Sequence, residues 1–359
     1  MSTGPRHRSQ TTGASSPSGE VPAHRVDGRK RRGRGGRPGL GYLRWRGQDR
    51  RGHTTWQRGP ILAALALLTA GVLAFHRQIP DTAGNIGSFI ESFLPWVGLA
   101  LPPLLVIALL RRSATAVAAL LVPTLLWSSL FGSLLTDKTG GAYDFTVVQH
   151  NVWAYNKDIP GTVRNMEAAD PDVISLVEVS GVELPQFESS LAKEYPYRAI
   201  EGTVGLWSRY PVSDTEPVDL KIGWVRALRA VVSTPAGQVA VFVAHLPSVR
   251  VTFDGGFTAN ERDAGAEALG QALAAEELPR VILLGDLNGT LNDRSLAPVT
   301  SQLRSAQAAA GAGFGFTYPA QFPMTRIDQI MTRGVIPTNA WTLPEDGSDH
   351  LAIAAHIEL

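Results

Sequence analysis

Three long apolar segments near the start of the chain constrain its fold most strongly. They cover about residues 60–75, 92–110 and 114–135, and none of them contains a charged side chain. A helix needs about 20 such residues to cross the hydrocarbon core, so the first segment is short. Prolines inside the second and third segments are tolerated in membrane helices. The sequence therefore predicts three transmembrane helices. The alternatives are a buried helical core or, for the first segment, a signal peptide.

The residues that precede these segments, 1–59, carry 14 Lys and Arg against 3 Asp and Glu, a net charge of +11. They are rich in Gly, Ser, Pro and Arg and too poor in aliphatic residues to bury a core, so we expect them to be disordered. The basic run at 29–37 could bind nucleic acid or anionic lipid. We favour a cytoplasmic tail that sets membrane topology, because the apolar segments follow directly.

Charged residues between the segments predict the orientation of the chain. The loop 76–91 holds one Arg and two acids and is expected outside, whereas Arg111 and Arg112 fill the next loop and are expected inside. A linker at 137–142 would then lead to an extracytoplasmic domain at 143–359. Residues 139–359 carry 15 Lys and Arg against 26 Asp and Glu, a net charge of −11. The chain has no cysteine, which excludes disulfides and Cys-ligated metals but does not fix the compartment.

The region 143–359 has the pattern of a soluble domain of mixed α and β structure. Strands are predicted at 145–149, 173–177, 230–233, 239–244, 281–284, 327–331 and 351–357. Helices are predicted at 162–169, 184–194, 260–277 and 296–309. Apolar residues alternate in the last strand, which predicts that it is half-buried. Because strands outnumber helices and do not alternate regularly with them, we expect largely antiparallel sheets.

The strand at 281–284 is wholly apolar, which predicts burial on both faces, and it leads into Gly285, Asp286 and Asn288. On an extended chain, side chains two residues apart point the same way. The carboxylate could bind a metal or orient a water, and the amide could donate to a phosphoryl oxygen. The alternative is an Asx turn after a core strand, with Gly285 supplying an unusual φ.

Other predicted strands also end in polar residues, namely Asn151, Glu178, His245, Asp328, Asp349 and His350. Taken singly, His245 could be a satisfied core histidine, and Glu178 could begin a solvated loop. Asp349 and His350 could belong to a cap or turn. Buried charges are costly unless they are paired or bind metal. Together the residues predict an oxygen-rich metal site with a general base, as the hydrolysis of a phosphate ester requires.

The order of these motifs resembles that of the endonuclease/exonuclease/phosphatase superfamily, the DNase I-like group. The matching motifs are, in order, QHN, PDVISLVE, GLWSRYPV, AHL, GDLN, RIDQI and GSDH. The resemblance covers 143–359 and implies an α/β (α+β) fold, a four-layer αββα sandwich with its site at one end of the sheets. The layout of three spans before such a domain is similar to that of the VanJ-type teicoplanin-resistance membrane proteins.

The resemblance implies a metal site. Glu178 matches the main Mg²⁺ ligand, Asn151 lies next to it in the pattern, and Asp349 matches a further carboxylate of the metal site. Mg²⁺ suits a few hard oxygen ligands that leave room for water and substrate, and Mn²⁺ is an alternative ion. A zinc site would show closely spaced histidines, which the sequence lacks.

The resemblance also implies catalytic roles. Asp286 would hold or deprotonate the attacking water, and Asn288 would bind the phosphoryl oxygen. His350 matches the essential histidine of the family and Asp328 the acid that orients it, so the choice of base between Asp286 and His350 stays open. His245 matches a histidine that contacts phosphate or protonates the leaving group.

Departures from the nuclease members point to a lipid-linked phosphate substrate. The domain is compact, is acidic and has no basic run, whereas nucleases grip the DNA backbone with basic side chains. A tether to the membrane raises the effective concentration of membrane substrates. Aromatic residues in the loops 247–257 and 314–322 could line an acyl or isoprenoid groove, or simply pack the loops.

We therefore expect a membrane-anchored, Mg²⁺-dependent phosphohydrolase with a lipid-linked cell-envelope substrate, and the VanJ-type layout implies a role in teicoplanin resistance. One alternative is an extracytoplasmic nuclease or nucleotide phosphodiesterase, and another is a binding module without activity. Nucleic acid is not the expected partner, and the sequence leaves the oligomeric state open.

Overall fold

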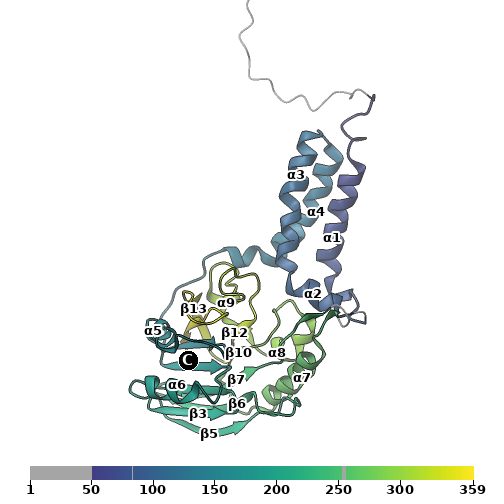
Figure 1. Cartoon of the computed structure of the whole chain (residues 1–359). Helices are drawn as coiled ribbons and strands as arrows, with labels where there is room; N and C mark the ends of the chain where they lie inside the picture. Colours follow the sequence, from purple (N-terminus) through teal and green to yellow (C-terminus); the bar gives the residue numbers. More distant parts are fainter. Residues whose placement is uncertain (1–50, 83, 253–255) are drawn as a thin grey trace, which may run out of the picture. The chain divides into compact units, whose positions relative to one another are not determined.

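The computed structural model describes residues 51–82, 84–252 and 256–359. The described residues all lie in one compact unit (Figure 1). Most of the predicted basic tail, including the run at 29–37, and the aromatic Phe253 lie outside the described residues.

The apolar segments form a group of helices. The elements are α1 (Pro60–Phe75), η1 (His76–Gln78), α2 (Ile86–Ser92), η2 (Leu94–Ala100), α3 (Leu101–Leu110), α4 (Ala114–Phe131) and η3 (Gly132–Leu135). Two helices, Pro60–Gln78 and Ala114–Leu135, are long and apolar enough to cross a membrane. The pair Ile86–Ser92 and Leu94–Leu110 is bent by 73° and would make a third span if counted as one.

The bend corrects the predicted second span, which was expected to begin at Ser92. Pro95 lies in the first turn of η2 and lacks the N–H that would continue the ladder of α2. The straight part of this segment therefore begins at Leu94. The segment α2 is a separate short helix, and its side chains contact the domain described below.

Small residues bring the long helices together. Ala66, Ala108, Ala116 and Leu120 form a buried cluster between α1, α3 and α4. Small side chains let helix backbones approach closely, as they do in membrane bundles. Large apolar side chains such as Ile61 and Leu125 point outward instead, and about 75% and 69% of their surfaces are exposed. A helix group with apolar residues on its outside suits a lipid environment.

The rest of the chain folds into two six-stranded sheets. The first has the order β13-β14-β1-β2-β4-β3, with β13 Ile336–Thr342, β14 Ile353–Glu358, β1 Phe145–Asn151, β2 Val173–Val177, β4 Val204–Ser208 and β3 Tyr197–Glu201. The second has the order β11-β12-β10-β7-β6-β5, with β11 Arg304–Ser305, β12 Asp328–Arg333, β10 Val281–Asp286, β7 Gly237–His245, β6 Ala227–Thr234 and β5 Val212–Pro217. Only β1–β2 and β7–β10 pair in parallel among the described ladders, which confirms largely antiparallel sheets.

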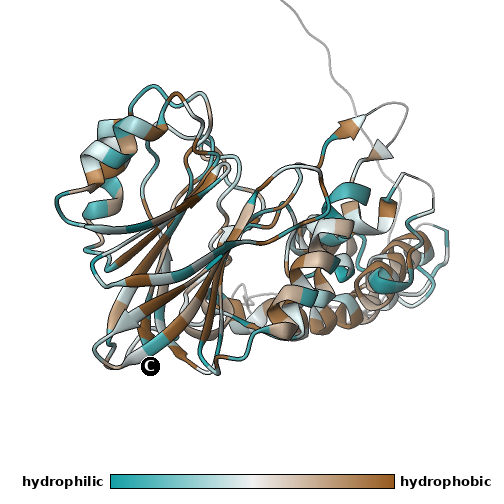
Figure 2. Cartoon of the chain, turned by 90° about the horizontal axis from the view of Figure 1, so that it is seen from below, coloured by the Kyte–Doolittle hydropathy of each residue, from teal (hydrophilic) through white to brown (hydrophobic). Residues whose placement is uncertain are grey.

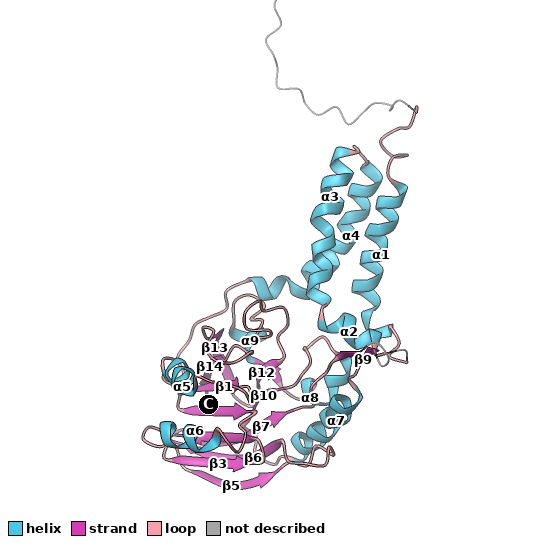
Figure 3. Cartoon of the chain, viewed as in Figure 1, coloured by secondary structure: helices cyan, strands magenta, loops and turns pink. Residues whose placement is uncertain are grey.

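Helices cover the outer faces of both sheets (Figure 3). The helices of the domain are α5 (Ile159–Glu167), α6 (Leu184–Leu191), α7 (Asn260–Ala275), η4 (Arg294–Leu296), α8 (Ala297–Thr300) and α9 (Ala306–Ala310). Met166 of α5 and Phe187 of α6 pack on the first sheet, and Leu269 of α7 packs on the second. A third cluster fills the space between the sheets, where Figure 2 shows apolar strands. The predicted αββα layers are therefore confirmed.

Strand β10 shows why its sequence is an unbroken apolar run. Ile282 and Leu284 face the core between the sheets, and Val281 and Leu283 face the core under α7. The strand is thus buried on both faces, as predicted. The last strand, β14, is more buried than the expected half-buried strand, because Ile353 to Ala355 are all buried between β13 and β1.

The predicted helix at 296–309 is wrong. The chain there forms η4, α8, the short strand β11 and α9. Arg304 and Ser305 pair with β12, and the Ser305 side chain then caps α9. The edge pairing interrupts a stretch whose composition favours a helix, which is a tertiary effect that local propensity does not contain. Strands β3, β4, β5 and β13 were not predicted, and neither was the two-stranded sheet of β8 (Val251–Thr252) and β9 (Gly256–Phe257).

Candidate active site

Strand register brings the predicted polar residues to one edge of the sandwich. The parallel register of β7 and β10 places His245 beside Asp286, and the antiparallel register of β10 and β12 places Asp286 beside Asp328. In the other sheet, Asn151 ends β1. Asn151 Nδ2 donates to Asp286 Oδ2 over 3.0 Å, so the strand ends of the two sheets meet.

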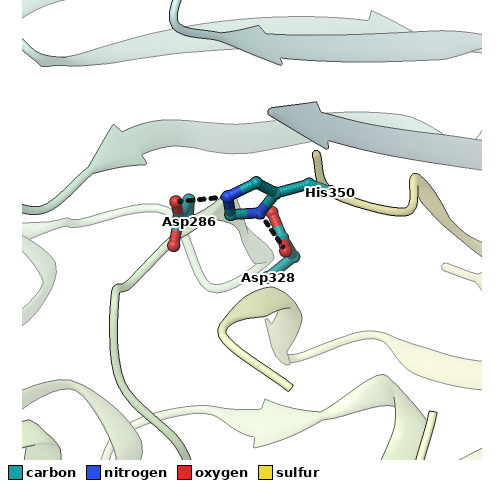
Figure 4. A group of neighbouring side chains, drawn as sticks. All are labelled: Asp286, Asp328 and His350. Carbon is teal, nitrogen blue, oxygen red and sulfur yellow. Dashed lines mark hydrogen bonds and ion pairs between the residues drawn. The ribbon is translucent and has the colours of Figure 1, made fainter. Parts of the chain in front are cut away.

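His350 lies between two carboxylates (Figure 4). Its Nδ1 is 2.8 Å from Asp328 Oδ2, and its Nε2 is 3.9 Å from Asp286 Oδ2. Burial alone would lower the pKa of His350, but the charges of Asp328 and Asp286 raise it to about 10. Burial opposes ionisation of Asp328 as well, yet His350 lowers the pKa of that acid. The imidazole is therefore protonated and held at both nitrogens.

One ligand atom from each of Asp286, Asp328 and His350 lies within 4.8 Å of the other two. That spacing would also suit a metal ion. His350 already directs Nδ1 at Asp328 Oδ2 over 2.8 Å, and its Nε2 faces Asp286. We therefore interpret the three residues as a chain of polar contacts that orders Asp286.

Asp286 is the most strongly perturbed acid of the group. It is 1% exposed and accepts a hydrogen bond from the Asn288 main-chain N–H over 2.8 Å. Burial, and then the charge of Asp328, raises the pKa of Asp286 to about 7. A carboxyl group with such a pKa can exchange a proton at neutral pH, which is a property of general bases.

Asn288 corrects one detail of the predicted geometry. It has a positive φ of 47° and forms an Asx turn with Asp286, so the chain is not extended there. Its Nδ2 donates to the Leu246 main-chain oxygen over 2.9 Å. Gly285 does not have a positive φ, so the expected unusual backbone angle is not found there. A Cβ at this position would lie 2.0 Å from the Ala244 main-chain oxygen, and this close approach explains why the residue is a glycine. The Asx turn and the polar Asp286–Asn288 pair, offered above as alternatives, are therefore both present.

Two further carboxylates line a pocket of about 430 Å³ beside Asp286 and His350. Glu178 has a positive φ of 61°, and Asp349 lies on the pocket wall with it. Burial, and in smaller part the charge of Glu178, raises the pKa of Asp349. Positive φ angles in residues other than glycine are rare and concentrate at functional sites. Converging hard oxygens in an accessible pocket fit Mg²⁺ or Mn²⁺.

Asn151 and His245 lie behind this pocket. The Asn151 Oδ1 accepts from the Trp153 N–H over 3.0 Å, and its Nδ2 is bonded to Asp286. His245 Nε2 is 3.5 Å from Glu178 Oε1, and the Arg226 guanidinium contacts its ring. Burial, followed by the charge of Arg226, lowers the pKa of His245 well below its usual value, so this imidazole is neutral.

The structure adds pocket residues that the motifs did not indicate. Tyr318 lines the pocket with its ring centroid 4.8 Å from that of His350. Trp153, next to the QHN motif, also lines it with a positive φ of 57°. Phe89 and Phe93 come from the region of α2. No local pattern could find the last two, because they precede the domain by more than fifty residues.

Comparison with known proteins agrees with the fold. None of the curated proteins matches the chain. A humanized TDP2 of D. rerio has a TM-score of 0.50 and 21% identity, over 60% of this chain and 99% of that one. An endonuclease/exonuclease/phosphatase of Bacteroides vulgatus has a TM-score of 0.50 and 18% identity, over 61% and 100%. At these identities the structures show a shared fold and no more.

A family model gives the assignment. The model described as the Endonuclease/Exonuclease/phosphatase family matches residues 148–350, more than half of the chain. The match begins inside β1 and ends at His350, so it includes Asn151 and every other polar residue of the site described above, but not Phe89 and Phe93. The chain therefore belongs to the Endonuclease/Exonuclease/phosphatase family, whose members are metal-dependent phosphoric ester hydrolases.

Proposed function

We propose that the chain is a membrane-anchored, Mg²⁺-dependent phosphohydrolase that cleaves a phosphate ester or pyrophosphate bond of a lipid-linked cell-envelope substrate. The observation that carries the proposal is the composition of the catalytic pocket. Its lining combines the carboxylates Glu178, Asp286 and Asp349 with apolar side chains that include Phe89 and Phe93. An ionic head and an apolar chain of one amphiphile fit such a pocket.

The apolar wall continues from α2 into the loop after β7. Phe89 packs edge-on against Phe257, with ring centroids 5.7 Å apart. Val249 and Val251 line the same pocket. These are residues of the aromatic and aliphatic loop at 247–257, which supports the groove hypothesis for that loop. For the loop 314–322, Tyr318 lines the pocket, whereas Phe314 and Phe316 stack on each other with centroids 5.1 Å apart.

Ion pairs fix α2 against the domain. Arg294 bonds Glu91 over 3.0 Å, pairs with Asp81 and donates to the His76 main-chain oxygen over 3.1 Å. Glu91 is fully buried, so the pair is desolvated and sensitive to the loss of either partner. Because 76–91 packs on the domain, both belong on the same side of a membrane. This supports the proposed topology, with a cytoplasmic N-terminus and an extracytoplasmic domain.

Each residue of the site has a role in the proposal. Glu178 and Asp349, with Asn151 beside them, would hold Mg²⁺, which supplies Lewis-acid polarisation of the phosphoryl oxygen when bound. His350 has a carboxylate at each ring nitrogen, which keeps it protonated and unable to act as a base. Asp286 therefore takes the proton of the attacking water. His350 then stabilises the negative charge that develops on phosphorus oxygens.

Two remaining residues complete the proposed mechanism. Asn288, whose Nδ2 lies 3.3 Å from Asp286 Oδ2, would orient the phosphoryl oxygen. His245 contacts the phosphate or the leaving group as a neutral donor, consistent with the pKa lowering caused by its burial.

A nuclease is the second candidate, because D. rerio TDP2 has been solved with a single-strand DNA product on the same fold. The net charge of −11 over residues 139–359 disfavours it, since tracking a phosphate backbone requires clustered cations.

The similarity of layout to the VanJ-type proteins adds a proposed contribution to teicoplanin resistance. A strain that lacks the gene would test it, because the concentration of teicoplanin that inhibits its growth should be lower than for the parent strain.

A substrate panel tests the proposed function. The full chain in lipid nanodiscs, with Mg²⁺, is given single-stranded DNA, a nucleotide diester, farnesyl monophosphate and farnesyl pyrophosphate. Lipid phosphate hydrolysis that disappears with EDTA and returns with Mg²⁺ or Mn²⁺ is expected. Rapid DNA cleavage without turnover of either lipid would make the nuclease the preferred function and overturn the lipid phosphohydrolase.

A further inference from the structure

A second pocket adjoins the catalytic pocket. It has a volume of about 640 Å³, against about 430 Å³ for the catalytic pocket. Ser248 and Arg250 line both pockets, so this segment forms the boundary between them. A molecule whose reacting atoms lie at Asp286 can therefore extend into either pocket.

The second pocket has no phenylalanine among its described lining residues, whereas the catalytic pocket has Phe89, Phe93 and Phe257. Asn85, Thr258, Asn260 and Glu261 supply amide, hydroxyl and carboxylate groups to its wall. Trp224, also in the wall, is 55% exposed. An exposed aromatic ring among amides and carboxylates suits a ligand that has both C–H faces and many hydroxyl groups. A saccharide has this chemistry.

The floor of the second pocket is connected to the catalytic machinery. Arg226 lines this pocket, and its guanidinium lies 4.8 Å from the centroid of the Trp224 ring. The same guanidinium contacts the ring of His245. The Arg226 side chain therefore links a group bound on Trp224 to His245.

Arg250 lies at the boundary with an exposed side chain. Its main chain is bonded to Thr258, and no ion pair joins its guanidinium to any residue in the described ranges. An exposed guanidinium at the rim of both pockets suits a phosphate group, which it can bind through two N–H groups.

We propose that the substrate has two arms, a lipid chain on the apolar side of the catalytic pocket and a saccharide in the second pocket, joined by a pyrophosphate that Arg250 binds. This inference rests on the proposed function and narrows the cleaved bond to the bridging P–O bond of a pyrophosphate that joins a lipid to a sugar. The oxygen of water forms a bond to phosphorus and the bridging P–O bond breaks. One water proton passes to Asp286 and then to the leaving phosphate oxygen, and the other stays on the new P–OH group until it ionises to solvent, so a lipid monophosphate and a sugar phosphate result.

Three substrates with the same farnesyl chain test this inference in the full chain in nanodiscs with Mg²⁺: the monophosphate, the pyrophosphate, and the pyrophosphate joined to N-acetylglucosamine. We expect kcat/KM for the sugar-bearing compound to exceed that for the pyrophosphate by about tenfold. Trp224→Ala should bring this ratio close to one. Trp56→Ala, which removes another exposed Trp (67% against 55% for Trp224) that is remote in sequence, should keep it.

A second pair of variants tests Arg250. Arg250→Gln should reduce the preference for pyrophosphate over monophosphate, and Arg304→Gln, which removes another exposed Arg, should retain it. If Trp224→Ala does not fold, Glu261→Ala replaces it, since Glu261 is exposed and also lines the pocket.

The outcomes separate this inference from the proposed function. If none of the three lipids is hydrolysed, the proposed function fails and this inference fails with it. If the two sugar-free lipids are hydrolysed at least as well as the third, and the Trp224 and Arg250 variants leave all ratios unchanged, the lipid phosphohydrolase stands and the two-armed substrate is overturned.

Discussion

Arg262 Nη2 donates to Ser88 Oγ over 3.0 Å, across 174 positions of the sequence. The Nη1 of the same fully buried guanidinium donates to the Asn288 main-chain oxygen over 3.0 Å. Asp293 supplies the countercharge over 2.7 Å. One side chain therefore holds both α2 and the turn that carries Asn288, so the position of α2 and the geometry of that turn are coupled.

Ser88→Ala tests this coupling. The variant loses a hydrogen bond to a charged group in a buried place, which should lower the free energy of unfolding by about 1–3 kcal/mol. If α2 positions the catalytic turn, kcat should fall more than KM rises. Thermal unfolding and steady-state kinetics of the full chain measure both effects. Ser129→Ala, at an exposed position of α4, is the matched control. An unaltered kcat in Ser88→Ala would show that the contact is only structural.

Glu178→Gln and His350→Ala should each abolish most turnover. The first removes a carboxylate proposed to hold the cation, and the second removes the charge between Asp286 and Asp328. Losing a positioned acid, base or charge costs about 10²–10⁴-fold in kcat. Circular dichroism should show both variants folded, and stabilisation by Mg²⁺ should be lost only in Glu178→Gln. Wild-type rates in both variants would remove the site assignment.

Gly285→Ala should destabilise the domain without touching any titrating group. A Cβ at this position would lie 2.0 Å from the Ala244 oxygen of the neighbouring strand, so β7 and β10 must separate. Overpacking of this kind costs about 1–3 kcal/mol or more. Gly181→Ala is the control, since nothing lies within 4 Å of the added atom. Equal melting temperatures for the two variants would contradict the packing argument.

Glu276→Gln should change the pH dependence of stability. Glu276 accepts two hydrogen bonds from Arg229, over 2.8 and 3.1 Å, and although burial opposes ionisation, this partner lowers its pKa. A lowered pKa adds stability that is present above the unfolded pKa of about 4.3 and is lost as the pH falls through the folded value. The melting temperature of the wild type should exceed that of the variant near pH 6, and the gap should close toward pH 3. A gap that stays constant would show that the ionised form is not responsible.

Much of the site could be predicted because each residue follows a strand whose apolar pattern is strong. The pairing of β7, β10 and β12 makes His245, Asp286 and Asp328 neighbours. Each of these residues stands at the end of its strand, and the sequence motifs mark those positions. Side chains that reach the pocket from elsewhere carry no such local signal. Phe89 in the pocket is of this kind, and so is Arg226, which contacts His245, since a phenylalanine in an apolar segment and an isolated arginine are ordinary residues by themselves.

The errors of the sequence analysis have physical causes as well. The expected helix at 296–309 is broken by edge pairing of Arg304 and Ser305 with β12, a contact between distant segments. Asn288 takes a positive φ that few residues other than glycine adopt, and Arg262 stabilises that turn from α7. In both places tertiary contacts overrule the local preference of the chain.

The bend after Ser92 has a practical consequence for anyone who studies this protein in solution. A fragment cut at the predicted linker would keep both sheets and every ionisable group of the site, yet it would lack Phe89 and Phe93. Such a fragment would also lose the contacts of Ser88 with Arg262 and of Glu91 with Arg294, so its activity and selectivity would say little about the intact molecule. The hydrophobic N-terminal region therefore supplies part of the catalytic pocket.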